Sequence, residues 1–148
     1  MIVKIKKLSD KAIIPTKGSA GAAAFDLYAP EDTFIPQQTR FILKTDIAIE
    51  LPQGYVADIR PRSGYSAKGF ASVNGVRFDA DVLLGTIDCD YRGNIGVIIK
   101  NCGSPFLVEK GQRIAQMLIH KAEDVEFYET NELSHTMRGN NGFNSTGV

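Results

Sequence analysis

The Gly85–Gly93 segment contains residue types whose spacing could support acid–base chemistry. It reads Gly-Thr-Ile-Asp-Cys-Asp-Tyr-Arg-Gly, so the carboxylates of Asp88 and Asp90 lie two residues apart and Tyr91 follows directly. A carboxylate beside an anionic substrate can act as general base on a water molecule, and a nearby tyrosine ring offers a stacking or shape-sensing surface. We expect one of these carboxylates to point inward and the other outward. A polar β-hairpin with a packed tyrosine is the alternative interpretation.

The Arg60–Gly64 segment offers hydrogen-bond donors suited to an oligophosphate. It reads Arg-Pro-Arg-Ser-Gly, which places two guanidiniums, a hydroxyl and the free N–H groups of a Ser-Gly turn side by side. Donors of this kind bind phosphate groups in proteins. Taken alone, however, the segment is better interpreted as a solvated strand end followed by a turn.

Two further polar side chains stand within apolar runs. Asp26, in Ala-Phe-Asp-Leu, could accept hydrogen bonds from metal-bound waters, although a single aspartate between apolar residues is more often a turn cap. The Gly111–Gln116 segment reads Gly-Gln-Arg-Ile-Ala-Gln and is typical of a turn that enters a buried strand, with Gln116 as a candidate polar contact. None of these segments decides the function alone.

Short β-rich runs between glycine, proline and asparagine must position these side chains. No long stretch shows a helical period, so the pattern predicts an all-β fold with very little helix, and a jelly-roll-like barrel fits it best. The continuously apolar Ile95–Ile99 run is typical of a strand buried on both faces. The predicted strands are Ile2–Ile5, Phe41–Leu51, Tyr55–Ile59, Ile95–Ile99, Phe106–Val108, Ile114–Ile119 and Val125–Tyr128.

Local signals predict one short helical turn, one hairpin and one tail. Ser66–Gly69 could close a single helical turn, with its glycine as the C-terminal stop. Asn74–Gly75 lies between alternating residues, which predicts a two-stranded excursion over Phe70–Asp79. Arg138–Val148 is glycine-rich and small, so we expect a mobile tail in the absence of ligand.

Composition narrows the class of protein. The chain has 148 residues, enough for one domain, and its 17 basic and 17 acidic side chains balance. Neither charge forms a long run, so we expect no nucleic-acid or membrane partner. Without an apolar stretch that could span a bilayer or act as a signal peptide, an intracellular protein, cytoplasmic or nuclear, is expected. Cys89 and Cys102 are predicted to be reduced thiols without a zinc site.

Five segments, taken in order, resemble the five motifs of the trimeric dUTPase family. They read Ala-Phe-Asp-Leu, Pro-Arg-Ser-Gly, Gly-Thr-Ile-Asp-x-Asp-Tyr-Arg-Gly, Gly-Gln-Arg-Ile-Ala-Gln and Arg-Gly-x-x-Gly-Phe-x-Ser-Thr-Gly. The resemblance covers essentially the whole chain, and the third and fifth motifs are long and specific. It implies a distorted jelly-roll barrel (β-clip) over residues 1–137, a flexible lid over 138–148, and a homotrimer whose active sites are shared between subunits.

The resemblance also implies hydrolysis of dUTP to dUMP and pyrophosphate, which keeps uracil out of DNA and supplies dUMP for thymidylate synthesis. Asp88 would be the catalytic base for the water that attacks the α-phosphorus. Mg²⁺ would be held chiefly by the triphosphate, with Asp26 bound to its waters. The implied substrate-binding residues are Arg62, Ser63, Gly64, Gly85, Thr86, Ile87, Tyr91, Gln116, Arg138, Phe143, Asn144, Ser145 and Thr146.

The implied roles divide these residues into three groups. The Arg62–Gly64 segment and Gln116 would hold phosphates. The Gly85–Ile87 backbone would read uracil, and Tyr91 would exclude a 2′-hydroxyl. The 138–148 segment would close over the substrate, with a stacking phenylalanine and two hydroxyls on the γ-phosphate.

The chain departs from the family pattern at three places. Ala24 and Asn144 each stand where the motif usually has glycine, although asparagine tolerates positive φ better than most residues. The stretch between Gly64 and Gly85 is several residues longer than expected, so the resemblance does not define the shape of the uracil pocket rim.

Two alternative functions fit parts of this pattern. A dCTP deaminase of this fold would need a glutamate ten residues after Asp88, where this chain has Ile98, and an apolar residue cannot transfer protons. A regulatory binding module could use residues 70–84 as its contact surface and keep the nucleotide site as a switch.

Overall fold

Strands make up nearly all the regular structure of the chain. The computed structural model describes residues 1–142, and α1 (Ser63–Lys68) is the one helix in this range. The predicted all-β fold with very little helix is therefore confirmed. The strands are β1 (Lys4–Lys7), β2 (Thr16–Lys17), β3 (Phe25–Tyr28), β4 (Thr33–Ile35), β5 (Thr39–Lys44), β6 (Ile47–Glu50), β7 (Tyr55–Arg60), β8 (Phe70–Ala71), β9 (Arg77–Phe78), β10 (Ala80–Val82), β11 (Gly85–Ile87), β12 (Gly96–Asn101), β13 (Phe106–Val108) and β14 (Arg113–Lys121).

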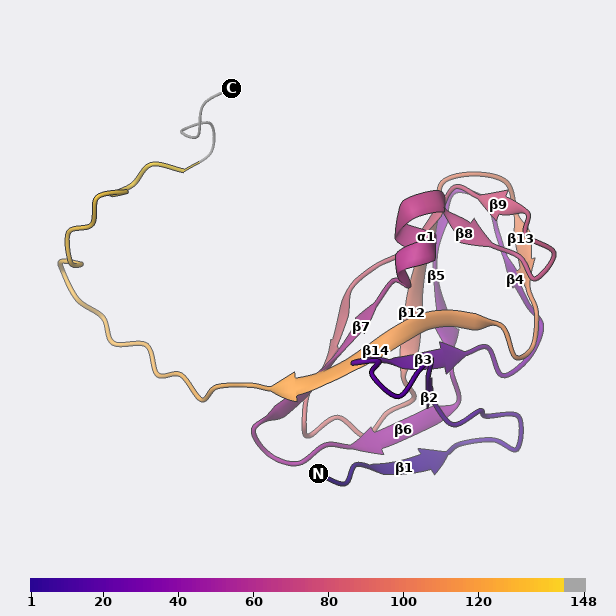
Figure 1. The fold of residues 1–148 in the computed structure, drawn as a ribbon, viewed down its shortest axis with the longest axis horizontal. Helices are drawn as coiled ribbons and strands as arrows, with labels where there is room; N and C mark the ends of the chain where they lie inside the picture. Colours follow the sequence, from indigo (N-terminus) through magenta and orange to yellow (C-terminus); the bar gives the residue numbers. More distant parts are fainter. Residues whose placement is uncertain (143–148) are drawn as a thin grey trace.

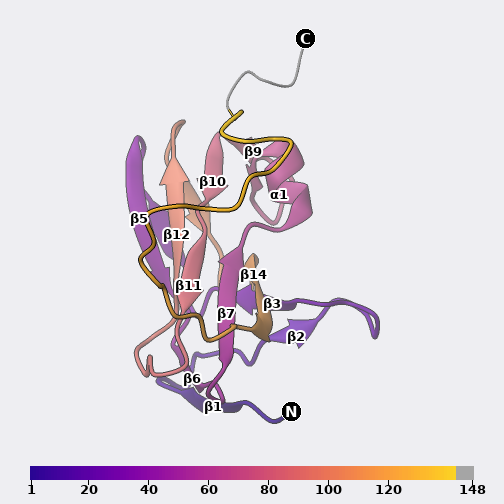
Figure 2. The ribbon, with the colours of Figure 1, turned by 90° about the vertical axis from the view of Figure 1, so that its left-hand side faces the viewer.

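Two larger sheets form the body of the fold (Figures 1 and 2). One has the strand order β11-β7-β14-β3-β2 and the other has the order β10-β12-β5. All of their pairings are antiparallel. Three two-stranded sheets, β1-β6, β13-β4 and β8-β9, complete the part of the chain described.

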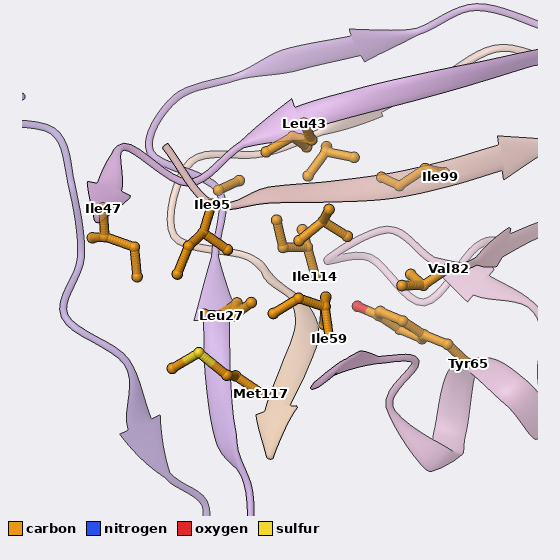
Figure 3. Close-up of a cluster of buried hydrophobic side chains, with 14 of the residues drawn as sticks. Leu27, Leu43, Ile47, Ile59, Tyr65, Val82, Ile95, Ile99, Ile114 and Met117 are labelled. Carbon is orange, nitrogen blue, oxygen red and sulfur yellow. The ribbon is translucent and has the colours of Figure 1, made fainter. Parts of the chain in front are cut away.

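The core lies between the inner faces of the two larger sheets (Figure 3). Leu27 and Ile114 from the five-stranded sheet meet Leu43 and Ile99 from the three-stranded sheet, and all four are buried. Each fully buried aliphatic side chain of this kind stabilises the fold by about 1.5–3 kcal/mol. Because successive side chains of a strand point to opposite faces, the residues between these buried positions lie on the outer faces of the sheets.

Strand β12 is buried on one face, so the prediction of burial on both faces is wrong in this chain. Val97 and Ile99 point into the core, whereas Ile98 is only half-buried. Ile98 lies opposite Ile42 of β5, which is 61% exposed. The three-stranded sheet therefore presents an apolar outer face.

The predicted helical turn and hairpin are both present, next to each other at one end of the barrel (Figure 1). Helix α1 starts at Ser63, three residues before the predicted turn, and ends at Lys68, followed by the capping residue Gly69, whose φ is +73°. A Cβ atom at Gly69 would lie 2.5 Å from the carbonyl oxygen of Phe78, so only glycine fits there. In the hairpin, Ser72 N–H donates to the Val76 carbonyl.

A long arm follows the last strand. After β14 ends, residues 122–142 contain no strand and run away from the barrel as an extended segment (Figures 1 and 2). The predicted strand Val125–Tyr128 is thus wrong for the isolated chain, where this segment has no neighbour to pair with. Phe127 is 99% exposed. The proposed division between residues 1–137 and a lid at 138–148 stays a prediction.

Within residues 1–142, no helix has the length and apolar character needed to cross a membrane.

Candidate active site

A cleft of about 990 Å³ lies where three parts of the fold meet. Its walls come from the five-stranded sheet, the start of α1 and the β8-β9 hairpin. Residues of the first, second and fourth motifs line it, including five that the sequence marked as candidate site residues. These residues are Asp26, Arg62, Ser63, Gly64 and Gln116.

Strand register explains why residues so distant in the sequence meet in this cleft. Gln116 of β14 lies opposite Asp26 of β3 on one side and opposite Arg60 of β7 on the other. Residues directly opposite each other project from the same face of a sheet. Gln116 Nε2 also donates to the Pro61 carbonyl at 2.9 Å, which fixes the amide beside the start of α1.

Asp26 forms an ion-pair network at the centre of the cleft. Arg62 Nε donates to Asp26 Oδ1 at 3.0 Å, and Arg113 Nη1 donates to Asp26 Oδ2 at 3.5 Å. The Asp26 side chain is 11% exposed and the Arg62 side chain 27% exposed, so water screens this pair less than a surface pair. The network holds both guanidiniums at the cleft.

The start of α1 contributes polar groups to the same cleft. Ser63 and Gly64 are exposed at the first two positions of the helix. The first N–H groups of a helix have no intrahelical partner, so they can donate to a bound ligand. Arg62 directly precedes the helix in extended conformation, which keeps its side chain beside these groups.

The third motif lies elsewhere on the chain. Strand β11 pairs with β7, with Ile87 opposite Ala57. The cleft residue Gln116 instead lies opposite Arg60 of β7, which is about 10 Å further along that strand. Asp88 continues away from the cleft, and neither Asp88 nor Tyr91 lines it. The structure therefore does not bring these two residues together with Asp26 and Arg62 within one chain.

The segment after β11 is folded as a compact turn. Asp88 and Asp90 both lie outside the core, so the expectation of one inward and one outward carboxylate is wrong. The Tyr91 hydroxyl donates to the Asn94 carbonyl at 3.2 Å, and its ring covers Gly93, where a Cβ atom would lie 2.3 Å from the hydroxyl. Tyr91 remains 44% exposed, with ring surface available to a ligand.

Strand β11 lies at an edge of the five-stranded sheet. Its only strand partner in the part of the chain described is β7, which leaves the other edge of Gly85–Ile87 without a strand partner there. An edge strand presents backbone N–H and C=O groups that can bond to a ligand.

Arg138 and the rest of the last motif cannot be placed at either region. Arg138 is exposed on the arm, where its Nε donates to the Asn141 carbonyl at 3.0 Å. Phe143, Asn144, Ser145 and Thr146 lie outside the residues that the structure describes.

A polar cluster next to the cleft escaped the sequence reasoning. Asp58 Oδ2 lies 2.9 Å from Arg60 Nη2 and 3.0 Å from His120 Nε2, and Thr86 Oγ1 donates to its other oxygen. The hydrogen bond from Arg60, assisted by His120 and Thr86, holds the pKa of Asp58 below its ordinary value. Alternation along β7 marks these side chains as outward-facing, but only strand register could have brought His120 to them.

The side chains that line the cleft fit a hydrated magnesium ion that is held mainly by the phosphates of a bound substrate. Asp26 is the one carboxylate that lines the described cleft, and residues 1–142 contain no group of three or more potential metal-binding side chains. Mg²⁺ keeps several waters and is commonly bound by one or two carboxylates together with substrate phosphates. A single carboxylate beside arginines that can donate hydrogen bonds to a phosphate is consistent with that mode.

Fold and cleft together define a jelly-roll-like β protein with a basic, oligophosphate-type site. The chain belongs to the dUTPase family, because the family model of that description matches residues 10–147. The deoxyuridine 5′-triphosphate nucleotidohydrolase of Arabidopsis thaliana is 42% identical over 146 residues, which cover 98% of this chain and 82% of the relative.

Solved structures support the same assignment. The dUTPase of Staphylococcus bacteriophage 80alpha, in a mutant form with dUpNHpp, superposes with a TM-score of 0.88 at 28% identity and covers 99% of both chains. A mutant dUTPase from phage phi11 of S. aureus, which coordinates a structural Mg(II) ion, has the same fold with a TM-score of 0.79 at 23% identity, over 89% of this chain and 98% of that one. The predicted jelly-roll-like fold and family are thus confirmed.

Proposed function

We propose that this chain is a dUTP nucleotidohydrolase that converts dUTP to dUMP and pyrophosphate. The observation that carries the proposal is the convergence of Asp26, Arg62, Ser63, Gly64 and Gln116 on one basic cleft. Family membership and a structural neighbour that holds dUpNHpp support the same substrate. In the cell, this reaction would keep uracil out of DNA and supply dUMP for thymidylate synthesis, in the cytoplasm or nucleus.

The cleft would bind the triphosphate. The Arg62 guanidinium, the Ser63 hydroxyl and the Gly64 N–H would donate to phosphate oxygens, and charge-assisted bonds of this kind are about twice as strong as neutral ones. Gln116, fixed by its bond to the Pro61 carbonyl, would donate its remaining amide hydrogen beside the α-phosphate.

Asp88 would be the general base. Its carboxylate would accept a proton from water as that water attacks the α-phosphorus, and pyrophosphate would leave from the opposite side. The exposure of Asp88 is consistent with this role, because the carboxylate is available to a substrate held by another part of the assembly.

Base and sugar would be read by the third motif. The edge of Gly85–Ile87 that has no strand partner offers backbone donors and acceptors for the uracil ring, and these would let three residues without special side chains select a base. Tyr91, packed on Gly93, would stand against the deoxyribose and exclude a 2′-hydroxyl.

Asp26 would hold the magnesium ion indirectly, through its waters. When bound, the ion would neutralise charge on the phosphate oxygens and on the pyrophosphate leaving group. Asp26 would meanwhile keep Arg62 and Arg113 beside the phosphates.

A homotrimer with shared sites would bring the separated groups together. Within one chain, Asp88 and Tyr91 lie away from the cleft that holds Arg62, so a complete site needs a second copy of the chain. The isolated chain also leaves apolar side chains exposed that an assembly would cover, such as Ile42 at 61% and Phe127 at 99%. The 122–142 arm, which finds no partner in its own chain, is available to pair with a neighbour.

The 138–148 segment would close each site as a lid. Phe143 would stack on uracil, Arg138 and Asn144 would contact the substrate, and Ser145 and Thr146 would donate to the γ-phosphate. Closure would exclude bulk water from the reacting phosphate.

A nucleotide panel tests the function directly. Incubation of the full chain with dUTP, UTP, dTTP or dCTP and Mg²⁺, followed by analysis of the phosphate products, should give dUMP and pyrophosphate from dUTP alone. Deamination of dCTP would favour the rival reaction, against which Ile98 on β12 argues because its side chain carries no proton-transfer group. Absence of pyrophosphate from dUTP would refute the proposal.

A further inference from the structure

The β8-β9 hairpin forms a wall of the phosphate cleft, although it lies outside the five motifs. Five of its residues line the cleft, in the stretch that makes the chain longer than expected between the second and third motifs. They are Ala71, Ser72, Val73, Gly75 and Arg77. The hairpin is therefore placed to contact whatever the cleft binds.

Packing holds this wall in a fixed position. Phe70 is fully buried, with its ring centroid 5.2 Å from that of Phe106, and Phe78 stacks on Phe106 at 4.5 Å. Gln112, itself buried, donates from Nε2 to the Ala71 carbonyl at 2.6 Å. These contacts tie both strands of the hairpin to the body, so side chains that face the cleft start from a rigid base.

Arg77 differs from the other cations of the cleft. Four arginines line it: Arg60, Arg62, Arg77 and Arg113. The others are paired with Asp26 or Asp58, whereas Arg77 makes no ion pair with any carboxylate in residues 1–142. One of its five N–H donors is used, by Nη1 on the Gly69 carbonyl at 3.1 Å. Because Arg77 has no paired carboxylate and lines the same cleft as three other arginines, its guanidinium is suited to bind an anion.

A second unused donor lies in the same wall. Ser72 Oγ is inaccessible to solvent and has no hydrogen-bond partner in the part of the chain described. A buried hydroxyl without a partner is costly, and a local movement that exposed it to the cleft would let it bond to a ligand there.

We propose that Arg77 is a substrate-binding residue that engages the terminal phosphates of the nucleotide; this rests on the proposed function. The position of the hairpin supports that end of the substrate. Gln116 is the residue assigned to the α-phosphate, and Gln112, which anchors the hairpin, lies four residues earlier in the chain, just before β14 begins. Arg77 lies directly opposite Ala71, the residue that Gln112 holds.

Calorimetric titration of three ligands into the full chain tests the inference. The ligands are inorganic tripolyphosphate, a non-hydrolysable imido analogue of dUTP, and dUMP. Arg77→Ala should weaken the binding of the first two by about tenfold, the scale of one charge-assisted contact, and leave dUMP binding within about twofold of wild type. Lys68→Ala is the matched control, because Lys68 is an exposed cation at the end of α1 that does not itself line the cleft.

Arg77→Lys keeps the charge and guards against a purely structural effect. It should weaken tripolyphosphate binding less than Arg77→Ala does, because the lysine ammonium keeps the positive charge and loses only the bidentate geometry of the guanidinium. Equal binding of tripolyphosphate by Arg77→Ala and Lys68→Ala, or an equal loss for dUMP and the imido analogue, would overturn the inference. If wild type failed to hydrolyse dUTP, the proposed function would fall, while tripolyphosphate binding would still decide the role of Arg77.

Discussion

Asp26 accepts a hydrogen bond from Arg62 at 3.0 Å, which joins the carboxylate assigned to the hydrated metal to a guanidinium assigned to phosphate. Arg113 approaches the second carboxylate oxygen at 3.5 Å. We therefore propose two tasks for Asp26: it orients these guanidiniums, and it is the one carboxylate lining the described cleft that would bind magnesium-bound water.

Asp26→Asn should lower kcat/KM for dUTP by about tenfold or more, because the amide loses both the charge that orients the arginines and part of its affinity for magnesium-bound water. The measurement is kcat/KM over a range of Mg²⁺ concentrations, and the variant should need more Mg²⁺ for half-maximal rate. Asp81→Asn, an exposed change on β10 outside the cleft, is the control. The same rate and the same Mg²⁺ dependence in Asp26→Asn and wild type would contradict both tasks.

Asp88→Asn should retain nucleotide binding and lose turnover by about 10²–10⁴-fold, the usual contribution of a general base. An amide of the same shape cannot accept the proton from the attacking water. Single-turnover hydrolysis and binding of the imido analogue, measured side by side, separate chemistry from affinity. Turnover within a few-fold of wild type would exclude Asp88 as the base, and Asp90→Asn shows whether its neighbour substitutes for it.

Sequence patterns predicted the local structure better than the assembly of the site. Gly69 ends a helix and Gly75 turns a hairpin because both need positive φ, which short-range sequence reveals. Gln116 meets Asp26 only through the register of β14 and β3, and no spacing along the chain shows that register. Val125–Tyr128 has the composition of a strand but no strand to pair with in its own chain.

Mixed trimers should recover activity from two inactive parents if each site combines Asp88 of one subunit with the cleft of another. Co-expression of Asp88→Asn and Arg62→Ala chains with different tags should give about a quarter of wild-type activity, because a random cyclic trimer pairs an intact Asp88 with an intact cleft at that frequency. The chain that carries both substitutions is the negative control. Mixtures no more active than the parents would mean that the sites are not shared.

Acid should weaken the fold partly through Asp46, which supports the loop before β12. Asp46 Oδ2 accepts from Ser9 Oγ at 2.8 Å and Oδ1 from Asn94 Nδ2 at 2.9 Å, and these two bonds hold the pKa of Asp46 below its ordinary value. A depressed folded-state pKa gives stability that is present above the unfolded-state pKa and is lost as the pH falls through the folded-state value. The Tm should therefore decrease as the pH is lowered below about 4.

Asp46→Asn isolates that charge, because asparagine also tolerates the positive φ of +57° at this position. The variant should be less stable than wild type at neutral pH, by roughly 1 kcal/mol, and its Tm should change less on acidification through about pH 4. Parallel Tm–pH curves for the two proteins would show that Asp46 does not contribute to the acid sensitivity.

Deletion of residues 138–148 should remove most of kcat/KM while leaving a folded protein of near-normal thermal stability. Arg138 is exposed and its side chain bonds within the arm, to Asn141, so its loss costs the core nothing. The segment is rich in glycine and asparagine, and ordering its backbone costs about 1–2 kcal/mol per residue. The lid should therefore close only when a ligand offsets that cost.

The triphosphate is the ligand that would offset the cost of closing the 138–148 lid. Phe143 on the base and the Ser145 and Thr146 hydroxyls on the γ-phosphate would supply the contacts, and dUMP lacks that phosphate, so closure should weaken after hydrolysis and product should leave. Melting curves with and without the imido analogue separate the two effects of the deletion. Wild type and the truncated chain should melt alike when free, and the analogue should stabilise the wild type more. A truncated chain with full activity and an equal ligand-induced shift would make residues 138–148 a trailing end without a part in catalysis.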